Sequence, residues 1–283
     1  MSELRRRFIR DLKIRNYSDS TINIYVRSIE KLSKYFGKCP TLLTEEDIKN
    51  YLGYVVSLNH SWSNVNIIQN AIKKLYCDTL QQEFKIASIK RPKLESKVKS
   101  ILSREEIVKL LDSCSNIKHK VIFMTMYACG LRVSEVCALQ IGDIDNSRMV
   151  IQVKNPKGHK QREVMMPEEL LEWLRLHIKS CPSKDYLFKG QGSTNKITAR
   201  TIQEIFRQKI VKTGIVKKVS THVLRHTHAT HCIEEGSDVL AVQKNLGHKN
   251  IRTTLTYYHL TAKLQKTLIS PLQTLPCYGK RAQ

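Results

Sequence analysis

Residues 221–226 read Thr-His-Val-Leu-Arg-His, residues 246–248 read Leu-Gly-His, and residues 253–258 end in two tyrosines. Further upstream, residues 130–135 read Gly-Leu-Arg-Val-Ser-Glu. Apolar residues recur at helical spacing around these stretches, and a glycine marks the end of each helical pattern, because glycine tolerates the left-handed backbone found there. The stretches therefore predict short helices that carry arginine, histidine and tyrosine side chains near their ends.

The rest of the chain continues this helical pattern with one exception. Residues 149–153 and 162–166 read as two strands joined by a turn that contains Asn-Pro-Lys-Gly at 155–158. Ser237 is expected to cap the helix that Gly247 ends. The predicted fold class is mainly α with a small antiparallel β-sheet (α+β).

Composition divides the chain into four segments. Residues 1–90 hold four helical patterns and no confident strand, which predicts a helical domain. Residues 91–101 are rich in Lys and Arg without an amphipathic pattern, as in a basic linker. A capping box from Ser103 opens residues 102–262 as a second domain. Residues 263–283 remain as a C-terminal segment.

The charge of the chain predicts its partner. The 283 residues carry 48 Lys and Arg against 25 Asp and Glu, a formal net charge of +23. Residues 1–100 hold 19 basic and 10 acidic residues, so the excess is not confined to one tail. A basic balance along the whole chain is typical of proteins that bind a polyanion, and double-stranded DNA is the expected one.

Several other classes of protein fit the sequence poorly. No apolar run approaches the roughly 18 residues of a membrane span, and the basic N-terminus has no apolar stretch behind it, so no membrane partner is expected. The eight cysteines form no Cys-x-x-Cys pair and read as reduced residues of a cytoplasmic protein. We expect no metal and no cofactor, since the sequence has no Asp/Glu metal cluster and no nucleotide-binding loop.

The polar residues of the first stretches suit phosphodiester chemistry. A guanidinium donates two hydrogen bonds to one phosphate and keeps its charge, so Arg132 and Arg225 are candidates for a phosphate clamp. His222 lies three residues before Arg225 and is expected to face the same way. Three further histidines of that helix are expected to point to other sides and to serve packing or a solvated face: His226, His228 and His231.

These motifs, in this order, resemble the signature of the tyrosine recombinase family, which includes phage integrases and Xer-like proteins. The resemblance lies in Gly-Leu-Arg-Val-Ser-Glu around Arg132, His222-x-x-Arg225, Leu-Gly-His248 and Tyr257 nine residues beyond. It is strong over residues 101–262, and it extends more loosely over 1–90, which resemble the family's core-binding domain. It implies a site-specific recombinase that cuts and rejoins DNA through a 3′-phosphotyrosyl link, without metal or ATP.

The resemblance also implies a role for each matching residue. Tyr257 matches the nucleophile, with its neighbour Tyr258 as the rival. Arg132 and Arg225 match the clamp, His222 a proton-shuttling histidine and His248 a donor to the phosphate. Lys157 matches the lysine that protonates the leaving oxygen, although Lys154 and Lys160 flank it. Glu135 either orients Arg132 without touching the phosphate or is an ordinary surface glutamate.

At the level of assembly, the resemblance implies a homotetramer on two DNA sites, near the nucleoid in the cytoplasm, with residues 263–283 docking onto a neighbouring protomer. Two alternatives remain open from the sequence. A type IB topoisomerase uses similar chemistry, and a catalytically idle DNA-binding or architectural protein would share the charge.

Overall fold

The computed structural model describes residues 3–58, 61–82, 100–154, 161–183, 185–190, 195–248, 250–251 and 254. The chain forms two compact units, Met1–Lys97 and Val98–Gln283. Each unit has its own hydrophobic core. Within the described ranges, no helix combines the length and the apolarity that crossing a membrane requires.

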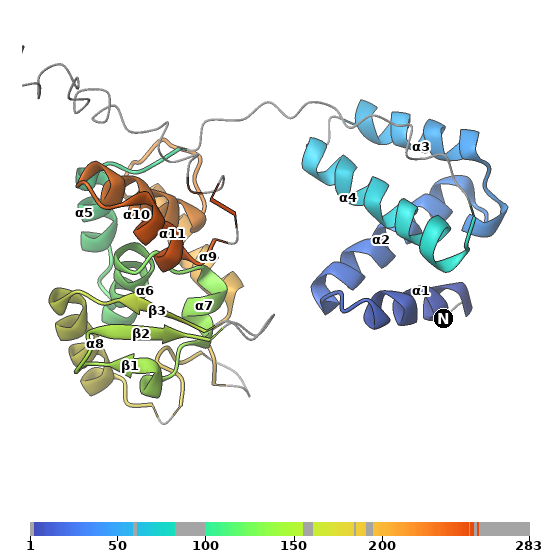
Figure 1. Cartoon of the computed structure of the whole chain (residues 1–283). Helices are drawn as coiled ribbons and strands as arrows, with labels where there is room; N and C mark the ends of the chain where they lie inside the picture. The colour runs from blue at the N-terminus through green and yellow to red at the C-terminus, as the bar shows by residue number, and fades with distance from the viewer. Residues whose placement is uncertain are drawn as a thin grey trace, which may run out of the picture. The chain divides into compact units, whose positions relative to one another are not determined.

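The first unit is helical over its described residues (Figure 1). Its α-helices are α1 (Glu3–Ile14), α2 (Asp19–Phe36), α3 (Glu45–Ser57) and α4 (Trp62–Lys73). A 3-10 turn, Pro40–Leu42, lies between α2 and α3, and α4 continues into a π-helical turn, Lys74–Thr79.

Local sequence explains where the helices of this unit begin and end. The Ser18 hydroxyl accepts a hydrogen bond from the Thr21 N–H at 3.3 Å and caps α2. Gly37 ends α2 with a φ of +63°, a conformation that costs glycine little. Thr44 and Asp47 form a reciprocal capping box at the start of α3.

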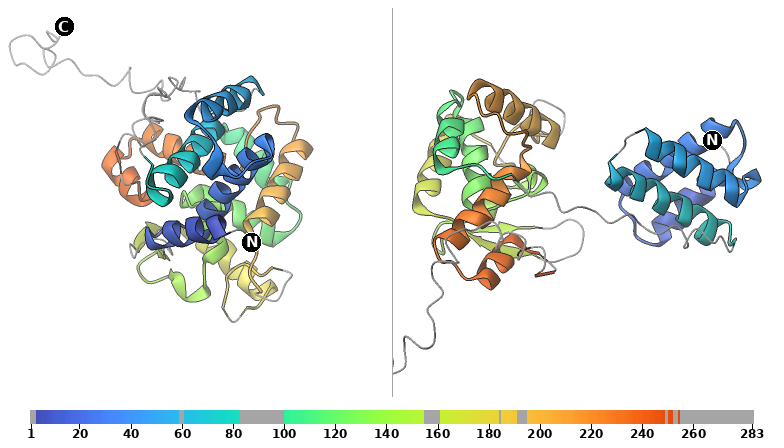
Figure 2. Two further views of the ribbon diagram at one scale, coloured as in Figure 1. Left: turned by 90° about the vertical axis from the view of Figure 1, so that its right-hand side faces the viewer. Right: turned by 90° about the horizontal axis from the view of Figure 1, so that it is seen from above.

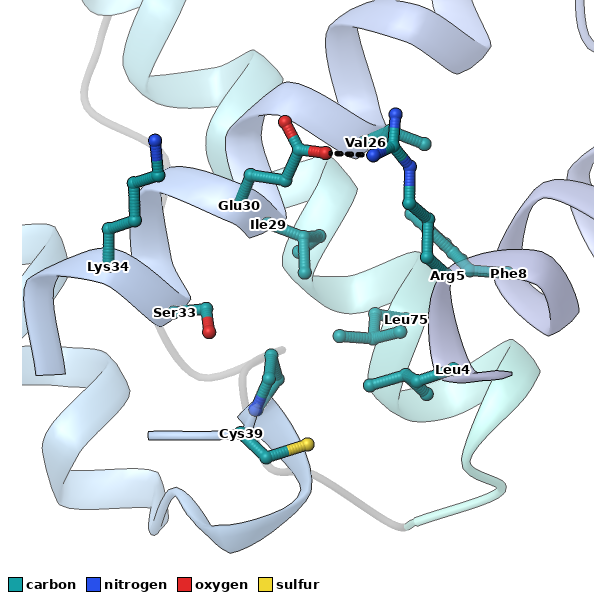
Figure 3. A pocket seen from close by; sticks show the side chains of 11 residues that line it. Leu4, Arg5, Phe8, Val26, Ile29, Glu30, Ser33, Lys34, Cys39 and Leu75 are labelled. Carbon is teal, nitrogen blue, oxygen red and sulfur yellow. Dashed lines mark ion pairs between the residues drawn. The ribbon is translucent and has the colours of Figure 1, made fainter. Parts of the chain in front are cut away.

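The core of the first unit lies between α1, α2, α3, α4 and the π-helical turn. Tyr76 of that turn is fully buried, and its hydroxyl donates to the Pro40 carbonyl at 2.6 Å. A pocket of about 550 Å³ opens beside this core, with Phe8 and Leu75 in its wall (Figure 3). An ion pair of 2.8 Å between Arg5 and Glu30 also lines it.

The hydrogen bond from Tyr76 gives a test of this packing. Replacing Tyr76 with Phe removes this donor from the buried Pro40 carbonyl, which still accepts from the Leu43 N–H at 3.3 Å. The loss of one hydrogen bond is expected to destabilise the protein by about 0.5 to 1.5 kcal/mol. Urea unfolding measures the difference. Tyr54→Phe serves as the control because Tyr54 is 40% exposed, so its stability should match the wild type. Equal stability of both variants would contradict the assigned hydrogen bond.

The second unit contains seven α-helices and three strands within its described residues. The helices are α5 (Arg104–Asp112), α6 (Ile117–Ala128), α7 (Val133–Ala138), α8 (Glu168–Ser180), α9 (Ala199–Lys212), α10 (His222–Glu234) and α11 (Val239–Leu246). The strands are β1 (Ile144–Asp145), β2 (Val150–Val153) and β3 (Arg162–Met165).

Helix α6 is the centre of the second unit. It packs against α5, α7, α8 and α10, and it buries Val121, Ile122, Phe123 and Met126. The Phe123 ring meets that of Phe206 on α9 edge to face, with centroids 5.6 Å apart. Figure 2 shows α10 and α11 from two further sides, and the two helices contact each other. The apolar run around α6 is thus the core against which the later helices pack.

The sheet is antiparallel with strand order β1-β2-β3. In its register, Ile151 pairs with Val164 and Val153 with Arg162. The predicted fold class is confirmed, and both predicted strands are present. The short strand β1 was not predicted, because two residues are too few for an alternating pattern to be recognised.

The predicted cap of α11 was wrong. Asp238, not Ser237, is the N-cap, and its carboxylate accepts from the Ala241 N–H at 3.0 Å. Ser237 instead completes the end of α10, where its N–H donates to the Cys232 carbonyl at 2.9 Å after Gly236 with a φ of +89°. Only four residues, 235–238, therefore separate the end of α10 from the start of α11.

Candidate active site

Arg225 lies almost completely buried on α10, with 2% of its surface exposed. Its Nη1 donates to the Gly130 carbonyl and its Nη2 to the Leu246 carbonyl, each at 2.7 Å. Gly130 follows α6 and Leu246 ends α11. The guanidinium thus links three helices through carbonyl groups, and carbonyl oxygens at a helix end attract a cation.

Glu135 is the anionic centre of this region. Its side chain is 7% exposed, and its Oε2 lies 4.0 Å from Arg225 Nη1. Oε1 accepts from Arg132 Nη1 at 2.8 Å, and Oε2 accepts from the Arg132 backbone N–H at 2.8 Å. The carboxylate therefore caps α7 and holds the Arg132 side chain. Glu135 is not an ordinary surface glutamate, and the contact expected with Arg132 is present.

A third arginine, Arg162 of β3, joins this cluster and was missed from the sequence. Its Nη1 and Nη2 donate to Oε1 and Oε2 of Glu135, each at 2.9 Å, and its Nε donates to the Asn245 carbonyl at 2.8 Å. The missed signal was the strand alternation. Val164 is buried, and a residue two positions away lies on the same face of a strand.

The arginines decide the protonation state of Glu135. Burial by itself raises the pKa of this carboxyl group. The hydrogen bonds from Arg162 and from the Arg132 backbone, together with the charges of both arginines, outweigh burial and lower the pKa to about 2. Glu135 is consequently ionised at neutral pH, and one negative charge faces three positive ones.

Two glycines allow the helix ends to approach this cluster. Gly130 has a φ of +62°, and a Cβ there would lie 2.6 Å from Cδ2 of His228. Gly247 has a φ of +66°, and a Cβ there would lie 3.0 Å from Cδ and 3.2 Å from Nε of Arg162. Both positions require glycine for conformation and for space.

His248 follows Gly247 at the end of α11. Its backbone N–H donates to the Gln243 carbonyl at 3.2 Å, which closes the helix end. Its ring Nδ1 lies 2.9 Å from the Thr254 hydroxyl, and that residue is fully buried. The imidazole orientation is therefore tied to the segment that precedes the two tyrosines.

The histidines of α10 divide into two groups. His222 is exposed at the helix start and stacks on His226, with ring centroids 6.2 Å apart. The expectation that His226 points to another side was wrong, because residues four apart share a helix face. His222 was expected to face the same way as Arg225. The two side chains differ in burial, because His222 is exposed and Arg225 is directed into the interior.

His228 and His231 are buried and serve packing, as expected. Burial lowers the pKa of His228 to about 4, so the ring is neutral at pH 7. The Asn245 amide lies 3.2 Å from its Nε2. The His231 Nδ1 and the Tyr127 hydroxyl share a hydrogen bond of 2.8 Å. These contacts hold α10 against α6 and against the end of α11.

Several predicted residues lie outside the described residues. They are Lys157, Tyr257 and Tyr258, Lys160, and the whole of residues 263–283. Of the linker predicted at 91–101, only residues 100 and 101 are described. Lys154, one alternative to Lys157, forms an ion pair of 2.5 Å with the buried Asp143.

The described residues contain no group of three or more His, Cys, Asp or Glu side chains placed to hold a metal ion. The seven cysteines of these ranges are free thiols, and Cys114, Cys129 and Cys137 are buried.

Comparison with known proteins identifies the class to which this fold and site belong. Residues 100–263 match the phage integrase family, and residues 4–86 match the SAM-like N-terminal domain of phage integrases. The chain therefore belongs to the phage integrase family, the tyrosine recombinases, enzymes that cleave and rejoin DNA strands in site-specific recombination.

Individual relatives support this assignment. A Sinorhizobium fredii protein named as an integrase/recombinase is 34% identical over 278 residues, covering 98% of this chain and 90% of its own. Tyrosine recombinase XerA of Pyrococcus furiosus is 30% identical, covering 95% and 93%.

Solved structures share the fold. A crystal structure of XerA recombinase, 30% identical, aligns with a TM-score of 0.55 over 93% of this chain and 95% of that one. The Tn1549 transposon integrase in complex with a circular intermediate DNA aligns with a TM-score of 0.75 at 20% identity, over 93% and 98%.

The buried carboxylate gives a test by pH. The folded pKa of Glu135, about 2, lies below the ordinary value of 4.5. The contribution of ionised Glu135 to the free energy of unfolding is therefore complete above about pH 5. It decreases as the pH falls through 4.5 toward 2. The shift corresponds to roughly 3 kcal/mol. The stability advantage of the wild type over Glu135→Gln should follow this course in urea unfolding between about pH 7 and pH 3.

The matched control is Glu163→Gln. Glu163 also receives two hydrogen bonds from one arginine, Arg148, at 2.7 and 2.9 Å, but this pair is exposed. Exposed pairs contribute about 0 to 1 kcal/mol, so this variant should stay close to the wild type at every pH. A pH-independent difference for Glu135→Gln would contradict the ionised, arginine-bound carboxylate.

Proposed function

We propose that this enzyme cuts each DNA strand with Tyr257 as nucleophile, at a phosphate held by Arg132, Arg225 and His248. The observation that carries the proposal is the charged cluster beside the helix end that leads to His248. In it Glu135 accepts a hydrogen bond from Arg132 and forms an ion pair of 4.0 Å with Arg225, which donates to the Leu246 carbonyl. The cluster joins, in one place, residues that lie up to 116 positions apart in the chain.

The charge of the cluster supports binding of a phosphodiester. Three guanidinium groups surround one ionised carboxylate, so the region keeps an excess of positive charge. Arg225 is held by carbonyl groups and keeps its full charge, while the Arg132 side chain is 35% exposed and accessible to an anion. Arginines fixed before the substrate arrives stabilise the charge that develops on the nonbridging oxygens in the transition state.

The proposed reaction is a transesterification. The Tyr257 oxygen attacks the phosphorus, the bond to the 5′-oxygen breaks, and a 3′-phosphotyrosyl link forms. His222 accepts the phenol proton, and Lys157 gives a proton to the leaving 5′-oxygen. His248 donates to a nonbridging oxygen. The reverse attack by a 5′-hydroxyl rejoins the strand, and since the phosphotyrosyl bond retains the energy of the broken bond, no ATP is required.

The two units divide the work in this proposal. Residues 1–90 form the core-binding domain, 91–101 a basic linker, 102–262 the catalytic domain, and 263–283 a segment that docks onto a neighbouring protomer. Four protomers act on two specific DNA sites, at the nucleoid in the cytoplasm. The outcome is integration, excision or resolution of DNA. Two observations support this division. Residues 1–90 and 102–262 are both rich in basic residues, and residues 4–86 and 100–263 match the two phage integrase domains.

The nucleophile is tested with suicide substrates, which are nicked duplexes that carry the ends of the DNA element encoding the protein. The wild type should form a covalent protein–DNA band, and Tyr257→Phe should abolish it because the attacking oxygen is gone. Tyr258→Phe is the matched control, with the same atom removed one residue away, and should retain the band.

The other outcomes are informative too. Loss of the band only in Tyr258→Phe would move the nucleophile by one residue. No band in the wild type on any element end, together with tight DNA binding, would overturn the proposed cleavage.

The C-terminal segment is tested by deletion of residues 263–283. This variant should bind a single DNA site as the wild type does, yet form fewer paired complexes of two sites, since docking acts between protomers. Gel-shift assays resolve the two species. Unchanged recombination by the truncated protein would contradict the docking role.

A further inference from the structure

Arg162 occupies a position that the proposed chemistry does not use directly. It lies on β3, its side chain is 13% exposed, and it donates hydrogen bonds both to Glu135 of α7 and to the Asn245 carbonyl at the end of α11. The proposed nucleophile and phosphate ligands lie elsewhere in the sequence. The role of Arg162 must therefore be inferred from its contacts with Glu135 and with the end of α11.

First, Arg162 holds both oxygens of Glu135. Its two Nη atoms form parallel hydrogen bonds of 2.9 Å to the carboxylate, while Arg132 contributes one side-chain bond of 2.8 Å. The two-bond pair is the stronger geometry. Because Arg162 balances the charge of Glu135, the charge of the more exposed Arg132 stays available for a phosphate.

Second, Arg162 fixes the end of α11. Its Nε donates to the Asn245 carbonyl at 2.8 Å, and the hydrogens of Gly247 face its Cδ and Nε, since a Cβ there would lie at 3.0 and 3.2 Å. His248 follows directly. The same planar guanidinium thus sets the distance between Glu135 on α7 and the backbone that presents His248.

We infer that Arg162 is a positioning residue of the phosphate site: it neutralises and orients Glu135, which frees Arg132 for the phosphate, and it joins Glu135 to the helix end that carries His248. This inference rests on the proposed function. A lysine cannot replace the arginine, because an ammonium lacks the planar fork that spans two carboxylate oxygens and a carbonyl.

The experiment compares Arg162→Lys, Arg162→Gln, Glu135→Gln and the double variant Arg162→Gln/Glu135→Gln in single-turnover cleavage of the suicide substrates. Arg148→Gln is the matched control, since it breaks the exposed two-bond pair with Glu163 on the same sheet. Both Arg162 variants should cleave about 10- to 100-fold more slowly at saturating enzyme, with unchanged affinity for DNA, because a small misplacement of a positioned group has effects of this order. Arg148→Gln should cleave at the wild-type rate.

The double variant separates positioning from a merely structural role. Without Arg162, the carboxylate of Glu135 takes up the charge of Arg132, so removing that carboxylate should make the double variant faster than Arg162→Gln alone. A double variant as slow as Arg162→Gln or slower, or an Arg162→Lys variant that cleaves at the wild-type rate, would overturn the inference. Arg162→Lys keeps the charge at this position and so guards against loss of folding, which thermal unfolding monitors.

A second readout does not depend on cleavage. Inorganic phosphate is titrated into the same proteins while the arginine side-chain signals are followed by NMR. Phosphate should bind Arg162→Gln about tenfold more weakly than it binds the wild type and Arg148→Gln, because Glu135 then takes up part of the charge of Arg132. Equal phosphate affinities would overturn the inference about Arg162, whether or not the wild type forms a covalent band. A missing covalent band by itself would contradict only the proposed function.

Discussion

The ionised carboxylate of Glu135 is the interaction on which the arrangement of the second unit depends. Arg132, Arg162 and Arg225 approach it from α7, β3 and α10, and two of them are largely buried. Buried guanidinium groups without an opposite charge are strongly unfavourable. One carboxylate makes their proximity possible, and it still leaves a net positive charge where a phosphodiester is to be bound.

Steric space is the second constraint. The carbonyl of Gly130 accepts from Arg225, and a Cβ on Gly130 would meet His228 and Leu246. Gly247 lies against the Arg162 side chain because it has no Cβ. Both also adopt a positive φ, at +62° and +66°. The glycines that end two helices in the sequence are thus the residues that let backbone and guanidinium groups approach closely. The positions of the helix ends and of the charged cluster therefore depend on each other.

Much of the fold was predictable because the signals are local. The capping box from Ser103 was recognised, since a hydroxyl or carboxylate near a helix start acts within three residues. Where two local signals compete, the prediction failed: Ser237 and Asp238 both suit a cap, and only the geometry after Gly236 assigns the cap to Asp238. The pairing of His222 with His226 was also available from helical spacing and was overlooked.

The sequence by itself determined the helical periods, the two longer strands, the basic charge, and the motifs that carry the family resemblance, because each depends on neighbouring residues or on composition. Tertiary structure alone decided that Glu135 is buried among arginines, that Arg225 is held between Gly130 and Leu246, and that Arg162 belongs to the same cluster. The contacts of Arg162 with Glu135 and of Arg225 with Gly130 and Leu246 join positions 21 to 95 residues apart. Which side chains meet over such separations is set by the packing of α10 against α6 and of α11 against α10 and β3, and not by any local pattern.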